Sequence, residues 1–168
     1  MSAILADTAA RRLRGFGLDL ACEIGRSGAI AAADKCEGDG ATPIGTWPVR
    51  AALLRPDRVA TLGGWRLPWR WLRTDDGWSD DVADTAYNRP IRHPHAFSAE
   101  RLWREDGLYD AIVILGHNDS PAVAGAGSAI FLHCADPGRA TEGCVAIARE
   151  SLLTLIGHLA PGDAIEIR

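Results

Sequence analysis

The chain lacks several features that mark common protein classes. Its four cysteines contain no Cys-x-x-Cys pair, which argues against a zinc ribbon and a thioredoxin-type redox motif. No stretch approaches the roughly 18 consecutive apolar residues that a membrane span needs. The formal net charge is −4 at pH 7, whereas nucleic-acid-binding domains are usually basic. The sequence therefore predicts neither a membrane nor a nucleic-acid partner.

No export signal is visible in this sequence. The apolar segment Ala3–Leu5 is too short for a signal core, and the basic residues Arg11, Arg12 and Arg14 follow it instead of preceding it. Reduced thiols are typical of intracellular proteins. We therefore expect a cytoplasmic protein.

The composition is that of a folded globule. The chain has 168 residues, of which 47% are hydrophobic and 24% are charged. A chain of this length buries a sufficient core without disulfides or a structural metal. We expect one domain over residues 1–168 and no cofactor.

Hydrophobic periodicity predicts mostly strands. Apolar and polar residues alternate over Phe16–Ile24, as in a half-buried strand, and Ala29–Ala33 is its expected hairpin partner. The apolar run Ala111–Leu115 indicates a strand buried on both faces. Two short helices are expected, over Ser98–Glu105 and Arg149–Leu159. The predicted fold class is mainly β, a sandwich or partial barrel with two short helices.

The segment from His133 to Cys144 carries the chemistry. The apolar run Ala129–Leu132 predicts a strand that delivers His133, and Gly143 directly precedes Cys144. A thiol attacks as the thiolate, so it needs a base, and histidine has a suitable pKa. Glycine lets the backbone turn and approach a substrate closely. Cys134 is expected to pack in the core, because neighbours in a strand point to opposite faces.

These residues resemble the L,D-transpeptidase catalytic domain (YkuD) family. That family's signature is a strand ending in histidine, then a loop, then Ser/Thr-His-Gly-Cys, which His133, Thr141, Gly143 and Cys144 match. The segment GDGATPIGTW is similar to the stretch of the family in which Thr-Pro-x-Gly precedes a strand. The segments GWSDDVADTAYNRPI, GHND, GSAIFLHCA and EGCVAI resemble one branch of short members without a signal. The resemblance extends from about Leu13 to the end of the chain.

Two departures from the family pattern bear on substrate recognition. Glu142 stands where the family usually has histidine. Ala146 stands where many members carry an arginine that faces the substrate's carboxylate. Another cation must then bind that carboxylate, and the candidates are Arg139, Arg149, Arg89 and Lys35, the only lysine of the chain.

The resemblance implies a covalent mechanism on murein peptides. His133 takes the proton of Cys144, the thiolate attacks a peptide carbonyl, and the N–H of Cys144, next to Gly143, stabilises the oxyanion. In the family, a backbone carbonyl near the histidine commonly orients the ring. The bond attacked joins an L-configured centre of diaminopimelate or lysine to a D-amino acid.

Two activities are compatible with this mechanism. Because no signal is visible, we favour an L,D-carboxypeptidase that removes terminal D-Ala from murein tetrapeptides in peptidoglycan recycling. The alternative is an L,D-transpeptidase that forms cross-links or exchanges D-amino acids. In both cases the partner is a murein peptide with a D-amino acid terminus.

The expected substrate-binding residues come from loops and strand ends. His117 directly follows the buried strand, and the polar segment 80–95 is irregular and proline-rich. In that segment, Asp80, Asp81, Tyr87 and Asn88 are expected to meet the substrate's amines and carboxylates. The candidates at the site are His117, Lys35, Arg139, Tyr87, Asn88 and Asp81.

Two further hypotheses belong to other classes. A zinc site built from His117, His133, Cys134 and Cys144 would make a metal-stabilised binding module. A catalytically inactive relative would only bind murein peptides. Our preferred interpretation requires no metal.

Overall fold

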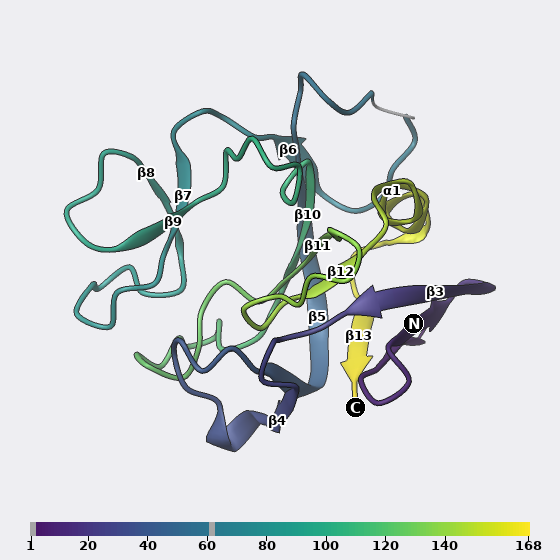
Figure 1. The fold of residues 1–168 in the computed structure, drawn as a ribbon. Helices are drawn as coiled ribbons and strands as arrows, with labels where there is room; N and C mark the ends of the chain where they lie inside the picture. The colour runs from purple at the N-terminus through teal and green to yellow at the C-terminus, as the bar shows by residue number, and fades with distance from the viewer. Residues whose placement is uncertain (1–2, 61–62) are drawn as a thin grey trace.

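The computed structural model describes residues 3–60 and 63–168. The described part is mainly β, as predicted (Figure 1). Its elements are β1 (Ala3–Asp7), β2 (Arg12–Gly15), β3 (Leu18–Glu23), β4 (Ala29–Ala31), the 3₁₀ turn η1 (Ala32–Asp34), β5 (Thr42–Leu54), β6 (Trp69–Trp71), β7 (Asp76–Ser79), β8 (Pro90–Arg92), β9 (Ala99–Arg101), β10 (Ala111–Leu115), β11 (Phe131–Cys134), β12 (Val145–Ile147), α1 (Arg149–His158) and β13 (Ala164–Ile167).

A partly barrel-like sheet organises the described residues. Its strand order is β10-β11-β12-β3-β2-β1-β13-β5-β4, with β6 also on β5, and it closes because β10 pairs with β5 as well. The long strand β5 makes closure possible. Its residues Gly45–Pro48 pair with β13, whereas Val49–Leu54 pair with β10. In Figure 1, β5 runs through the centre of the molecule.

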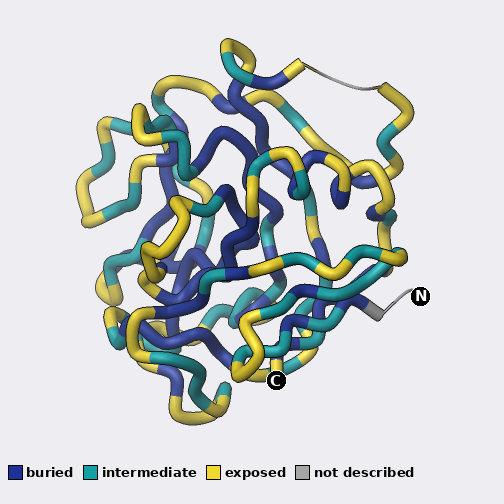
Figure 2. The backbone as a smooth tube through the Cα atoms, turned by 45° about the vertical axis from the view of Figure 1, so that its right-hand side comes forward, coloured by how far each residue is buried: buried dark blue, intermediate teal, exposed yellow. Residues whose placement is uncertain are grey.

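A small sheet with strand order β8-β7-β9 forms a second layer beside the main sheet (Figure 1). Two apolar clusters follow from this arrangement. One includes the buried face of α1, with Leu152, Leu155 and Ile156. The other joins Leu53 and Ile112 of the main sheet to side chains from the small-sheet region, such as Trp78 and Leu102. Figure 2 shows the buried backbone in the interior and exposed backbone mainly in the peripheral loops.

Strand β11 contributes side chains to both apolar clusters, because successive side chains of a strand point to opposite faces. Leu132 and Cys134 lie in the cluster that includes α1, and Phe131 lies in the other. Since His133 is the next residue in alternation from Phe131, its ring leaves the sheet on the same side as Phe131. The packing position expected for Cys134 is confirmed, since its side chain is 3% exposed.

Two local predictions were wrong. The segment expected as a helix, Ser98–Glu105, instead contains the short strand β9, followed by irregular chain. Strand β9 pairs with β7, and Glu100 lies opposite Trp78 in that pairing. Tertiary pairing outweighs the weak helical preference of so short a segment. The expected hairpin partner Ala29–Ala33 forms β4, which pairs in parallel with β5. It cannot pair with β3, because both edges of β3 are taken by β2 and β12.

The second helix prediction is confirmed, with α1 ending one residue earlier than expected. Within residues 3–60 and 63–168, no helix combines the length and the apolar character needed to cross a bilayer.

Candidate active site

The parallel pairing of β11 with β12 places Cys144 beside the start of β11. Leu132 lies opposite Val145 in this pairing, so the residue before Val145 lies level with Phe131. The backbone N–H of Phe131 donates to Sγ of Cys144 at 3.4 Å, and the thiol donates to the carbonyl of Ala129 at 3.2 Å. The thiol therefore sits between two main-chain groups, with only 8% of the residue exposed.

A tight turn presents Cys144. Oγ1 of Thr141 donates to the carbonyl of Cys144 at 2.6 Å and accepts from the N–H of Gly143 at 3.1 Å. Gly143 has φ +137°, and a Cβ at that position would lie 2.9 Å from the carbonyl oxygen of Ala41. Glycine is therefore required by both backbone conformation and space.

The ring of His133 is oriented by a backbone carbonyl. Its Nδ1 lies 2.9 Å from the carbonyl oxygen of Cys134. Because a carbonyl only accepts, we assign the proton to Nδ1, which leaves Nε2 with a free lone pair. The ring of Tyr109 packs edge-on against the imidazole, with centroids 5.2 Å apart. This carbonyl is the kind of orienting partner that the family resemblance implied.

Burial shifts the pKa values of both candidate groups in the direction that favours their neutral forms. Burial lowers the pKa of His133 to about 4. Burial raises the pKa of Cys144 to about 12, and the negative charge of Glu100 adds to this shift. The arrangement therefore suits an imidazole that accepts the thiol proton as attack begins, and not a pre-formed thiolate.

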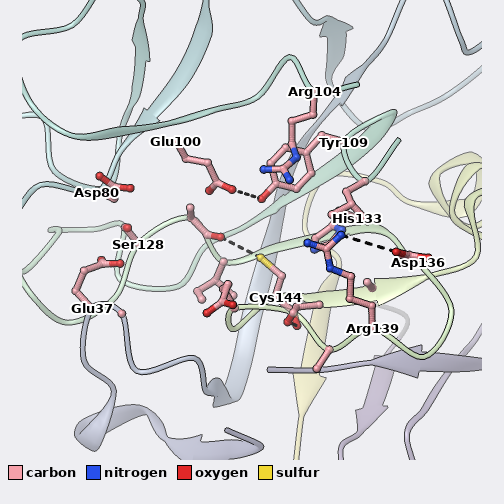
Figure 3. A pocket seen from close by; sticks show the side chains of 18 of the residues that line it. Glu37, Asp80, Glu100, Arg104, Tyr109, Ser128, His133, Asp136, Arg139 and Cys144 are labelled. Carbon is pink, nitrogen blue, oxygen red and sulfur yellow. Dashed lines mark hydrogen bonds and ion pairs between the residues drawn. The ribbon is translucent and has the colours of Figure 1, made fainter. Parts of the chain in front are cut away.

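Cys144 and His133 share a cavity of about 380 Å³. The charged residues of its lining are unevenly distributed around Cys144. Figure 3 shows Glu37, Asp80 and Ser128 on one side of Cys144, and Arg139 with Asp136 on the other. Polar and ionisable residues of the lining are Lys35, Glu37, Asp80, Glu100, Arg104, Tyr109, Ser128, His133, Asp136, Arg139, Thr141, Glu142 and Cys144.

Comparison with known proteins places this geometry in a family. The model of the L,D-transpeptidase catalytic domain, YkuD, matches residues 2–167. The chain belongs to the L,D-transpeptidase catalytic domain family. A comparison with curated protein sequences gives no significant match.

Solved structures show a similar fold. L,D-transpeptidase 3 from Mycobacterium tuberculosis is 14% identical with a TM-score of 0.51, and the match covers 99% of this chain and 60% of that one. Bd1075 of Bdellovibrio bacteriovorus is also 14% identical with a TM-score of 0.51, over 99% of this chain and 47% of that one. The chain therefore spans about half the length of these structures, and the likeness concerns the fold.

Of the residues that we expected at the site, the structure brings some together in the cavity of this L,D-transpeptidase-family domain. Cys144, His133, Lys35 and Arg139 line it, and Gly143 forms the turn beside Cys144. The side chain of Lys35 is only 3% exposed, and its Nζ forms an ion pair with Asp39 at 2.6 Å.

Three expected substrate-binding residues lie outside the lining, in the irregular segment between β7 and β8. Tyr87 donates its hydroxyl to Glu37, which does line the cavity. The Asn88 side chain accepts from Nε1 of Trp78 and so braces the small sheet. Asp81 accepts from the backbone N–H of Ala83 at 2.9 Å. In this structure all three therefore have structural hydrogen bonds.

His117 also lies outside the lining. Its ring packs edge-on against Trp47, with centroids 4.8 Å apart, and burial lowers the pKa of His117 to about 4. A Cβ at Gly127 would contact both His117 and Lys35. Gly127 therefore lies between the imidazole and the lysine that reaches the cavity.

The family departures have clear structural settings. Glu142 is exposed and pairs with Arg26 at 2.8 Å, and Ala146 lines the cavity without offering charge. Of the candidate cations, Arg149 pairs with Asp110, and Arg89 donates to the backbone of residue 119. Arg139 lines the cavity, and its side chain is 59% exposed with Asp136 3.8 Å away. Arg139 is therefore the most available of the four.

Several cavity residues were not found from the sequence. Glu100 and Arg104 lie in the segment mistaken for a helix, and Tyr109 lies two residues before the start of β10. Ser128 follows the Gly125–Gly127 connection. The only available signal was that each lies beside a strand end or turn, where site residues often gather.

The zinc hypothesis is not supported by the geometry. Within residues 3–60 and 63–168, no three His, Cys, Asp or Glu side chains are grouped to hold a metal ion. Sγ of Cys134 faces the carbonyl of Ala111 at 3.8 Å and lies in the cluster beneath α1. Cys144 belongs to the other cluster. The thiols of Cys134 and Cys144 therefore lie on opposite faces of the main sheet.

Proposed function

We propose that this L,D-transpeptidase-family domain is a cysteine-dependent L,D-carboxypeptidase. Its substrate is a murein tetrapeptide, from which it removes terminal D-Ala in peptidoglycan recycling. The observation that carries the proposal is the shared cavity of Cys144 and His133, with the imidazole fixed by the carbonyl of Cys134. Cys144 is the nucleophile and His133 the general base.

The proposed reaction proceeds in two halves. In the first, the thiol leaves its hydrogen bond to Ala129, Nε2 of His133 takes its proton, and sulfur attacks the peptide carbonyl. His133 returns the proton to the departing amine as the C–N bond breaks and D-Ala leaves. In the second half, His133 deprotonates a water molecule, which attacks the thioester and releases the shortened peptide and the thiol.

The oxyanion formed in each half needs a hydrogen-bond donor. The N–H of Gly143 is already bonded to Thr141, so we assign this role to the N–H of Cys144. The Thr141 hydroxyl also holds the carbonyl of Cys144 at 2.6 Å. Both sides of the Cys144 residue are thereby fixed while the charge develops.

Arg139 is the proposed partner of the D-Ala carboxylate. A planar guanidinium pairs well with a carboxylate. Ion pairs of exposed groups are weak, and the 3.8 Å contact with Asp136 is long. A substrate carboxylate can therefore replace Asp136 at low cost.

Hydrolysis and transpeptidation differ in the group that resolves the thioester. Ligand cavities commonly enclose about 300–1,000 Å³, so one of about 380 Å³ suits a single peptide terminus. Water needs no binding surface of its own, whereas a second peptide does. Transpeptidation remains the second candidate because the family model bears that name.

Mass spectrometry of the full chain incubated with a murein tetrapeptide tests the proposal. Loss of one D-Ala, absent in Cys144→Ala, is the expected result. A cross-linked dimer or an exchanged D-amino acid would instead identify a transpeptidase. Binding of the peptide without any turnover would identify an inactive binding module.

A further inference from the structure

Three carboxylates of the cavity have no cationic partner. Glu37 accepts from the hydroxyl of Tyr87 at 2.5 Å, and Glu100 accepts from the hydroxyl of Tyr109 at 2.6 Å. Asp80 has a buried Oδ1 with no hydrogen-bond partner. Across residues 3–60 and 63–168, no Lys, Arg or His forms an ion pair with any of the three within 4.0 Å.

The cations of the same cavity are each paired. Lys35 pairs with Asp39 at 2.6 Å, Arg104 with Asp106 at 2.5 Å, and Arg139 with Asp136 at 3.8 Å. Glu142, at the rim, is paired with Arg26. In the described part of the chain, the carboxylates of the lining that have no ion pair are therefore Glu37, Asp80 and Glu100.

Ser128 provides an independent observation at the same place. It is 9% exposed and lines the cavity, yet its Oγ has no hydrogen-bond partner. A buried hydroxyl without a partner is unfavourable. Figure 3 shows it on the same side of Cys144 as Glu37 and Asp80. A ligand that donates hydrogen bonds would satisfy the hydroxyl and the carboxylates together.

The carboxylates also interact electrostatically. Burial raises the pKa of Glu100, whereas its hydrogen bond with Tyr109 and the positive charge of Arg104 lower it. The negative charges of Asp80 and Glu37 act in the same direction as burial and raise it. A ligand cation would relieve this repulsion. The described residues offer no group of three side chains able to share one metal ion, so a larger organic cation with several N–H donors fits better.

We infer that Glu37, Asp80, Glu100 and Ser128 form a subsite for a primary ammonium group of the peptide substrate. The enzyme then selects peptides whose diamino acid carries a free side-chain amine, and it rejects peptides in which that amine is acylated. This inference rests on the proposed function, because it places a murein peptide in the cavity.

Binding to the Cys144→Ala protein tests the subsite without turnover. Isothermal titration calorimetry compares two lysine-containing murein tetrapeptides, one with a free ε-amine and one acetylated at that nitrogen. Acetylation removes the charge, so we expect affinity to fall about tenfold or more. Equal affinity within about twofold would overturn the inference.

Variants locate the effect. In the Cys144→Ala background, Asp80→Asn and Ser128→Ala should each reduce the preference for the free amine. Glu142→Gln is the matched control, because it removes a rim carboxylate that already has a cation partner, and it should leave the preference unchanged. Loss of the preference in the control but not in Asp80→Asn would contradict the assignment.

Two further titrations identify the source of the ammonium. D-Alanine amide, which has an amine but no diamino side chain, should bind only weakly. Tight binding that Asp80→Asn abolishes would assign the subsite to an acceptor amine. Displacement of the free-amine peptide by Mg²⁺ alone would overturn the inference in favour of a metal site.

Release of D-Ala by wild-type protein from both peptides at equal rates would refute the subsite while upholding the carboxypeptidase.

Discussion

The two ends of the cavity are built differently. We call the end with His133 and Cys144 the main-sheet end, and the end with Glu37, Asp80 and Glu100 the acidic end. His133 and Cys144 come from β11 and the turn before β12, within the main sheet, and main-chain groups hold their reactive atoms. Glu37 comes from the loop after η1, Asp80 directly follows β7, the central strand of the small sheet, and Glu100 lies in its edge strand β9. The side-chain partners of the two glutamates are tyrosine hydroxyls.

In the proposed mechanism, this difference separates chemistry from substrate recognition. A nucleophile and a base must keep a fixed separation, which a paired sheet and a tight turn provide. Substrate selection depends on charge and shape, which loops and a peripheral sheet can vary without disturbing the paired strands. Changes at the main-sheet end should therefore abolish activity, whereas changes at the acidic end should alter selectivity and thiol reactivity.

The largest effect is expected from Cys144→Ser. A hydroxyl is far less readily ionised than a thiol, so D-Ala release should fall by roughly a thousandfold or more. The measurement is the rate of D-Ala release under saturating peptide. Cys134→Ser is the matched control, because that thiol lies in the opposite cluster, and it should keep most activity. An inactive Cys134→Ser protein that remains folded would place the nucleophile elsewhere.

Gly143→Ala should also remove most activity. The new Cβ meets the carbonyl oxygen of Ala41 at 2.9 Å in a left-handed backbone region, so the turn that presents Cys144 must shift. Strain of about 1–3 kcal/mol should appear in urea unfolding. Gly138→Ala, at φ +80° with open space around it, should show only the smaller conformational cost and retain its activity. Full activity in Gly143→Ala would show that the turn geometry is dispensable.

The smallest effect concerns the influence of the acidic end on the thiol. Because the pKa of Cys144 is raised to about 12, its alkylation by iodoacetamide should increase about tenfold per pH unit between roughly pH 7 and 10. The charge of Glu100 contributes to that rise, so Glu100→Gln should lower the thiol pKa. Alkylation at pH 8 should then be several-fold faster.

Peptide mapping resolves the reaction at Cys144 from that at exposed Cys36. Asp136→Asn is a suitable comparison at the opposite end of the cavity and should change the rate less. A plateau in the wild-type rate near neutral pH would mean that a thiolate–imidazolium pair already exists in the free protein.

The sequence predicted the main-sheet end well for a physical reason. A strand ending in His133 and a turn requiring Gly143 are local features, visible as an apolar run and a glycine before a cysteine. The buried strand Ala111–Leu115 was equally local, and it forms β10 as expected. Placing Cys134 in the core followed from strand alternation alone.

Glu37, Glu100 and Ser128 of the acidic end escaped prediction, because their position depends on tertiary pairing, whereas Asp80 was named together with Asp81. Glu100 enters the cavity because its segment pairs with β7 as a strand. We had expected this segment to form a helix. Asp81 and Asp80 are adjacent in sequence, and nothing local shows that Asp80 lines the cavity while Asp81 bonds to the backbone. Closure of the sheet through β5 was likewise invisible, because it requires one strand to pair with both β13 and β10.

Trapping of the acyl-enzyme tests the central claim most directly. Wild-type protein is mixed with a murein tetrapeptide, quenched in acid within the first turnovers, digested and mapped by mass spectrometry. We predict a tripeptide joined as a thioester to Cys144. If acylation still proceeds when His133 is replaced by a weaker base, this thioester should accumulate to a higher level. Release of D-Ala with no adduct on Cys144, and at an undiminished rate in Cys144→Ala, would contradict this prediction.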